Sequence, residues 1–217
     1  MNPPRAQAST PTATRTRARR GEGELLRGEI LDAAERLLIE TGNEDSVSIR
    51  AISEAVGVTP PSIYLHFPDK EALLFAVCDR QFAIFQAALN AAARSSDDPV
   101  EALERRAEAY VKFGLEHPEA YRIMFMGRAG LMERHAESVE KGAGAFTDLV
   151  DDVERAREAG AIREDIDSQT AAIFLWTGAH GITSLLISAP HFPWGDTERL
   201  VRELCALKLR ALRREPS

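Results

Sequence analysis

The chain has 217 residues, of which 44% are hydrophobic, 28% charged and 6% aromatic. That length and apolar content allow a buried core and suit one small domain followed by a larger one. We expect no apolar run to approach the roughly 20 residues of a membrane span, and the N-terminus lacks the apolar core of a signal peptide. We therefore predict a cytoplasmic protein.

The two cysteines, Cys78 and Cys205, are isolated in the sequence. They lack the paired spacing of a zinc site or of a disulfide framework. We expect both to be small core residues, with redox sensing as the alternative, and we expect no metal and no cofactor.

Charge is unevenly distributed along the chain, whose net charge is −7. Residues 1–20 contain five arginines and no acidic residue, whereas residues 21–217 contain 22 basic and 34 acidic residues. The Pro, Thr, Ala and Ser content of residues 1–22 favours a disordered basic arm. Such an arm can follow DNA phosphates or enter the minor groove. The alternative is a solvating tail without a role. The arginines are Arg5, Arg15, Arg17, Arg19 and Arg20.

The first predicted helix spans Leu25 to Thr41, because its apolar residues recur on one side at helical spacing. Gly42 is placed to end it. Two short helices are predicted next, between Ser48 and Phe67. Ser48 is placed to cap the first of them, and Gly57 stands where a tight turn favours positive φ.

The second short helix is predicted to start at Pro60, with Thr59 as its cap. Ile63 and Phe67 should face inward, leaving Ser62, Tyr64 and His66 outside. Two helices joined by a glycine turn, the second polar and protruding, are typical of a helix-turn-helix that enters the DNA major groove. The spacing alone equally allows an ordinary helical hairpin with a solvated face.

The segment from Ile52 to Phe67, with Pro68 to Leu74 after it, resembles the N-terminal domain of the tetracycline-repressor (TetR) family of transcriptional regulators. That family has an I-A-x-x-A-G-V turn, a recognition helix ending in Y-x-H-F, and a lysine that opens a long helix. Ser53 stands here in place of the usual alanine. The resemblance implies a three-helix DNA-binding domain at residues 23–70, with DNA contacts at Ser48, Arg50, Thr59, Pro60, Ser62, Tyr64, His66 and Lys70.

Roles can be assigned to some of these contacts. Arg50 is the expected base reader, since a guanidinium can bind guanine O6 and N7 together. Ser48, Tyr64, His66 and Lys70 are expected to bind phosphates.

Only helices are predicted after Phe67, which makes the fold all-α with about nine helices. A long helix from Asp69 to about Ala93 connects the DNA-binding domain to a helical domain at residues 71–217, and its tilt could transmit a change between them. The later helices are predicted at residues 100–116, 121–126, about 130–159, about 168–189 and about 196–213.

The second domain carries another resemblance. The run from His117 to Phe125 and the run from Trp176 to Gly181 resemble one TetR branch, named for a Trp-His-Gly (WHG) signature. The resemblance implies a homodimer through the last two helices and a small-molecule effector pocket inside this domain. Apolar or aromatic effectors would suit the candidate lining, which comprises Phe82, Phe85, Tyr110, Phe113, Met124, Trp176 and His180. His180 can instead be a satisfied core or interface residue.

These patterns favour a dimeric, ligand-responsive regulator, most simply a repressor that binds a near-palindromic DNA operator. A helical enzyme is the first alternative, but the five histidines are scattered and no nucleophile has an adjacent base. A protein-interaction module that has lost DNA binding is the second alternative. The polar reading helix and the arginine arm argue against it.

Overall fold

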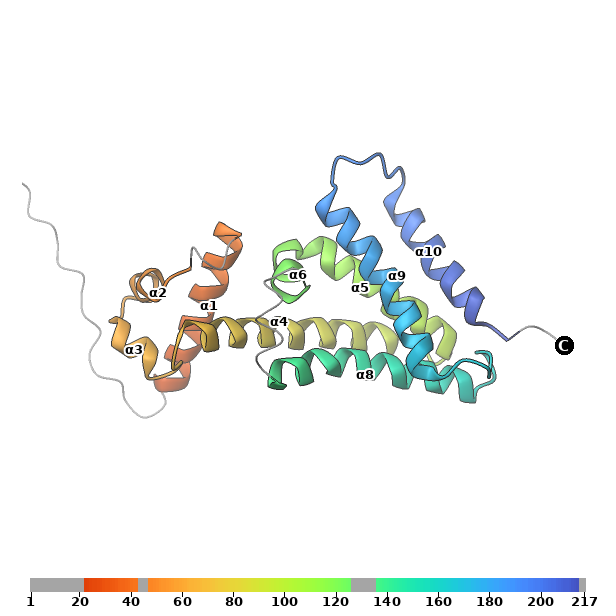
Figure 1. The fold of residues 1–217 in the computed structure, drawn as a ribbon, viewed down its shortest axis with the longest axis horizontal. Coiled ribbons are helices and arrows are strands. Elements are labelled where there is room, and N and C mark those ends of the chain that lie inside the picture. The colour runs from red at the N-terminus through yellow and green to blue at the C-terminus, as the bar shows by residue number, and fades with distance from the viewer. Residues whose placement is uncertain (1–21, 43–46, 126–135, 215–217) are drawn as a thin grey trace, which may run out of the picture. The chain divides into compact units, whose positions relative to one another are not determined.

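The computed structural model describes residues 22–42, 47–125 and 136–214 (Figure 1). Within these ranges the chain forms nine helices, which confirms the all-α prediction, and one isolated bridge joins Ile162 to Arg213. The chain divides into two compact units between Val77 and Cys78, inside helix α4, and each unit is described by itself. The predicted arginine arm lies outside the described residues. The helices are α1 (Glu22–Thr41), α2 (Ile49–Val56), α3 (Pro60–Tyr64), α4 (Lys70–Ala93), α5 (Pro99–Glu116), α6 (Pro118–Phe125), α8 (Ala136–Glu158), α9 (Ser168–Ser188) and α10 (Thr197–Leu212).

The first unit contains α1, α2 and α3 and the start of α4. Helix α1 begins three residues before the predicted Leu25 and ends at Thr41 as predicted, and Gly42 follows with a left-handed φ of 59°. Apolar side chains from all three helices are buried in this unit and hold α3 against α1 and α2. They include Ile30, Ala34, Val47, Ile52, Ile63 and Phe67.

Side-chain caps fix where the connecting helices begin. Asp69 Oδ1 accepts the backbone N–H of Ala72 at 2.7 Å, which starts α4 at Lys70 as predicted. Asp98 accepts from two backbone N–H groups and starts α5, and Asp167 does the same for α9 through the N–H of Thr170. These carboxylates satisfy donors that have no partner within their helices.

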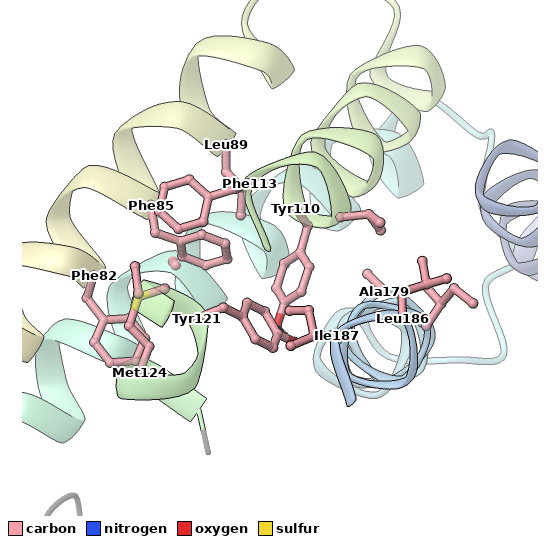
Figure 2. Close-up of a cluster of buried hydrophobic side chains, with 14 of the residues drawn as sticks. Phe82, Phe85, Leu89, Tyr110, Phe113, Tyr121, Met124, Ala179, Leu186 and Ile187 are labelled. Carbon is pink, nitrogen blue, oxygen red and sulfur yellow. Dashed lines mark hydrogen bonds between the residues drawn. The ribbon is translucent and has the colours of Figure 1, made fainter. Parts of the chain in front are cut away.

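The second unit is built around α5, which packs against α6, α8, α9 and α10. Its aromatic core brings together Phe82 and Phe85 of α4, Tyr110 and Phe113 of α5, and Tyr121 of α6 (Figure 2). Edge-to-face ring contacts, such as the 5.0 Å centroid distance between Phe85 and Tyr110, join these helices. The two cysteines are buried, as predicted.

Helices α5 and α9 approach closely at one point, where Gly114 faces Thr183. A Cβ atom at Gly114 would lie 2.2 Å from Thr183 Cγ2. Thr183 is fully buried, and its hydroxyl donates to Ala179 O at 2.7 Å. Glycine therefore sets the distance between these two helices.

Helix α8 is described from Ala136, so the predicted start near Gly130 lies outside the described residues. The helix continues through Gly142 and Gly144 without a break, and Gly160 follows it with a φ of 72°. Helices α9 and α10 lie side by side (Figure 1, blue). Helix α9 starts as predicted and ends one residue early, and α10 is one residue shorter than predicted at each end.

Two helices, α4 and α9, are long and apolar enough by composition to cross a membrane, although only 39% of each apolar window is buried. The expectation that no segment approaches this length and apolarity was therefore wrong. Polar residues interrupt both sequences, but α9 contains no Asp, Glu, Lys or Arg at all. Core helices of globular proteins share this composition, and α9 packs on α5, α8 and α10.

Candidate DNA interface and ligand cavity

The turn between α2 and α3 has the geometry that its sequence predicts. Ser48 Oγ accepts the N–H of Ala51 at 3.1 Å and caps α2. Gly57 adopts φ 74° and ψ 33°, a left-handed conformation that side chains disfavour. Ser53, which replaces the usual alanine of the motif, is buried, and its hydroxyl donates to Arg50 O at 2.8 Å. The substitution therefore adds a satisfied hydroxyl without disturbing the turn.

Helix α3 starts with a rigid segment. Thr59 has extended backbone angles, φ −86° and ψ 150°, and Pro60 and Pro61 follow. The predicted side-chain cap is not made, because Thr59 Oγ1 lies 3.1 Å from Ser62 Oγ instead of bonding a backbone N–H. Pro61 removes one of the two donors that such a cap would serve, and the other, the N–H of Ser62, donates to Thr59 O at 2.9 Å, which explains the difference.

The exposed surface of α3 and the residues after it bring most of the predicted DNA contacts together. Thr59, Pro60 and Tyr64 are exposed, whereas Ser62, His66 and Lys70 are partly buried. Leu65, which was not predicted as a contact, is 85% exposed. An apolar side chain between Tyr64 and His66 on a protruding turn was the available signal, since such a group can contact thymine methyls.

Arg50 lies on α2 and is exposed. Its Nε donates to Glu54 Oε1 at 2.9 Å, one helical turn away. This hydrogen bond raises the pKa of the guanidinium. The bond occupies Nε and leaves both terminal nitrogens for another partner, which is the geometry that an end-on contact to guanine requires.

The second unit contains a cavity of about 340 Å³ between α4, α5, α6, α8, α9 and α10. Its size lies at the lower end of the range for small-molecule sites. The wall is almost wholly apolar and includes six aromatic side chains, Phe82, Phe85, Tyr110, Phe125, Phe146 and Trp176.

Four of the seven predicted pocket residues lie in this wall, namely Phe82, Phe85, Tyr110 and Trp176. The other three do not line it. Phe113 and Met124 are buried in the adjoining core, where Figure 2 shows Met124 beside Phe82, and His180 takes part in a hydrogen-bond cluster behind the wall.

His180 is partly buried among hydroxyl groups. Tyr121 Oη lies 2.7 Å and Tyr110 Oη 3.0 Å from its Nδ1, and Trp176 Nε1 donates to Tyr110 Oη at 3.3 Å. Burial lowers the pKa of His180 and raises that of Tyr121, so both are neutral near pH 7. A neutral imidazole has one acceptor nitrogen, and Tyr121 is the nearer donor.

A polar network lies against the far end of the cavity. Arg106 forms a buried ion pair with Asp152, and its Nη2 donates to Asn90 Oδ1 at 2.8 Å. Asn90 and Gln86 both donate to Asp148. Arg106 lines the cavity, as does Lys208 on α10, and the sequence reading had selected neither. A charged residue on an otherwise apolar helical stripe was the signal in both cases.

The outward face of α9 is largely apolar in the described part of the chain, whereas α10 exposes mainly charged side chains and one large apolar one, Leu207. Ile173, Phe174 and Trp176 of α9 and Leu207 of α10 are each between 37% and 56% exposed. Trp176 belongs to this face and to the cavity wall at once.

Comparison with known proteins shows what these two units are. Residues 30–77 match the family described as bacterial regulatory proteins, tetR family, and residues 103–207 match the tetracyclin repressor-like C-terminal domain. The chain belongs to the TetR family of transcriptional regulators. TetR proteins are DNA-binding regulators rather than enzymes, so the helical-enzyme alternative is excluded.

Similar proteins cover different shares of the chain. The transcriptional activator FasR of Mycolicibacterium smegmatis is 28% identical over 58% of this chain, and the chain spans only 58% of FasR's length. The transcriptional repressor Rv1474c of Mycobacterium tuberculosis is 29% identical over 82% of this chain and 88% of its own length. A solved protein of unknown function from Rhodococcus sp. RHA1 is 27% identical, covers 87% of this chain and 96% of its own, and has a TM-score of 0.77.

Proposed function

We propose that this TetR-family chain is a ligand-responsive repressor that binds a near-palindromic operator as a homodimer in the cytoplasm. The α2–α3 geometry carries the proposal, since a capped α2, a left-handed Gly57 and an exposed α3 present polar groups as a helix-turn-helix does. The contacts to DNA are Ser48, Arg50, Thr59, Pro60, Ser62, Tyr64, His66 and Lys70. The arginine arm at residues 1–22 adds salt-dependent affinity.

The apolar outward face of α9, together with the exposed Leu207 of α10, supports the homodimer. A charge-free helix that exposes Ile173 and Phe174 needs a partner surface, and a second copy offers an equally apolar one. A two-fold dimer sets two reading helices about one DNA turn apart, on the order of 34–36 Å, and so reads inverted half-sites.

The cavity is the effector site in this proposal. An apolar or aromatic molecule bound there changes the separation of the two DNA-binding domains and lowers operator affinity. We also assign the chain to the WHG branch. The contact between Tyr121 of the first motif and His180 of the second, with Trp176 5.8 Å from His180 by ring centroids, supports this assignment.

The test starts with a pull-down of genomic DNA fragments by the purified protein at two salt concentrations. The retained fragments are then sequenced. One near-palindromic site should survive as the salt concentration rises. Uniform binding that vanishes with salt would leave only the arginine arm active and would favour the protein-interaction module.

Variants then separate base reading from phosphate binding. Arg50→Ala should weaken the operator more than random DNA, by about 1–3 kcal/mol for a bidentate contact, whereas Lys70→Ala should weaken both alike. Lys112→Ala removes one exposed positive charge from the second unit and serves as the control. Equal losses for Arg50→Ala and Lys70→Ala on both DNAs would contradict the division of roles.

A further inference from the structure

The cavity wall contains two cationic side chains, which differ in how their charges are compensated. Arg106 is paired with Asp152, which also bonds Arg155, and the network extends through Asn90 to Asp148. Two arginines and two aspartates make this network neutral. The remaining nitrogen of Arg106, Nη1, has no acceptor among the described residues. It is inaccessible to solvent, so a ligand in the cavity does not reach it.

Lys208 is different, because no acidic side chain of the described residues pairs with it. Its Nζ donates to Phe174 O at 2.6 Å and to Thr177 Oγ1 at 3.4 Å, and it lies 3.9 Å from the centroid of the Phe174 ring. These neutral acceptors leave a whole positive charge at the edge of an apolar cavity. Burial lowers the pKa of this ammonium group, as expected where no anion offsets the lost hydration.

Gly178 explains how the lysine reaches this place. A Cβ atom at Gly178 would lie 2.5 Å from Lys208 Cε and 2.6 Å from Cδ. The absence of a side chain lets the lysine stem lie across α9 at Gly178, and both residues line the cavity. The ammonium group extends past Gly178 to Phe174 O and Thr177 Oγ1, and the side chain is partly exposed.

We propose that the cavity takes a ligand with an apolar body and one acidic group, and that Lys208 binds the acidic group. The inference rests on the proposal that this cavity is the effector site, and it names the class of effector. The apolar body occupies the aromatic interior. The acidic group stays beside the Lys208 ammonium group, since a carboxylate buried without a cationic partner would lose far more free energy of hydration.

The volume sets the size of suitable probes. A cavity of about 340 Å³ corresponds to about eleven water volumes of about 30 Å³ each, and thus to about a dozen heavy atoms. Decanoate and methyl nonanoate form an isomeric pair of this size, one acidic and one neutral. Naphthaleneacetate, the acid, and methyl naphthoate, the neutral ester, form a second such pair with an aromatic body. Each pair has one apolar body type and differs in charge.

Calorimetric titration of the full-length protein tests the proposal. In at least one pair the acid should bind about tenfold to a hundredfold more tightly than the ester, the range for a hydrogen bond to a charged group. Lys208→Met keeps the stem but not the charge, so it should remove the preference by weakening acid binding more than ester binding. Gly178→Ala should weaken the preference by displacing the lysine, whereas Lys112→Met, on the exposed surface, should leave it intact.

Three results would overturn the proposal. These are equal binding of acid and ester to the unaltered protein, a preference that survives Lys208→Met, and no binding of any of the four probes. Operator retention by the same preparations is measured in parallel. Lost operator binding with a retained acid preference would refute the proposed regulator, yet support the assignment of Lys208.

Discussion

Substitution of Gly114 by alanine tests whether the α5–α9 crossing is as tight as the structure indicates. The new methyl carbon would lie 2.2 Å from Thr183 Cγ2 and 3.1 Å from the Tyr121 ring, whereas unstrained carbon contacts lie near 3.5–4.0 Å. Thr183 cannot rotate away without losing its bond to Ala179 O. Overpacking of this kind costs about 1–3 kcal/mol. The overlap of more than about 1 Å with the normal contact distance places Gly114→Ala near the upper end.

Alanine also returns about 1 kcal/mol of helix propensity relative to glycine, so the net loss in the free energy of unfolding should be about 2 kcal/mol. For a chain of this length that lowers Tm by about 4–8 °C. The measurement is urea denaturation at one fixed protein concentration, because dimerisation would otherwise shift the transition.

A double variant supplies the control for this clash. Thr183→Ser removes Cγ2 but keeps the hydroxyl that donates to Ala179, and by itself should cost about 0.8 kcal/mol for one buried methyl group. In the Gly114→Ala/Thr183→Ser variant the 2.2 Å clash is absent, so most of the alanine penalty should disappear. Additive losses in the double variant, or unchanged stability of Gly114→Ala, would refute the proposed close approach.

Two further predictions concern buried polar groups of the second unit. Asp152→Asn leaves the Arg106 charge without its buried partner and should lower the free energy of unfolding by about 3–5 kcal/mol. The double variant Arg106→Met/Asp152→Leu should recover most of that loss. Both are measured by chemical denaturation, and a loss below about 1 kcal/mol for Asp152→Asn would contradict the role of the pair. Burial lowers the pKa of His180, so the unfolded chain binds a proton near pH 6.5 while the folded chain binds it only at lower pH. The free energy of unfolding should therefore fall as the pH drops below about 6.5. His180→Gln should lose that part of the pH dependence, and an unchanged difference in stability between pH 7.5 and 5.5 would count against this interpretation.

The helix boundaries were predictable because their causes are local. Ser48, Asp98 and Asp167 each accept an N–H two or three residues ahead, and Gly57 fixes a turn by its own φ. The cap at Thr59 failed for an equally local reason, since the two prolines that follow leave little for it to bind. Such features depend on neighbours that the sequence places side by side.

The cavity was less predictable because its wall comes from six helices. Phe82, Tyr110 and Trp176 could be selected by type, but core and lining aromatics have the same spacing, and Phe113 packs in the core. Arg106 and Lys208 were missed because their partners, Asp152 and the Phe174 carbonyl, lie 46 and 34 residues away in the chain. The face on which a charge lies depends on this long-range packing.

The two prolines of α3 have a consequence for how the protein and its operator adjust to each other. Pro60 and Pro61 each restrict φ to about −65°, and Thr59 is already extended. Helix α3 therefore loses little conformational entropy when it binds, and it can adjust little to a mismatched site. Adjustment falls to the DNA, whose flexible pyrimidine–purine steps deform at the lowest cost. Operators of this protein should therefore differ from mismatched sites in DNA stiffness as well as in the bases that they present.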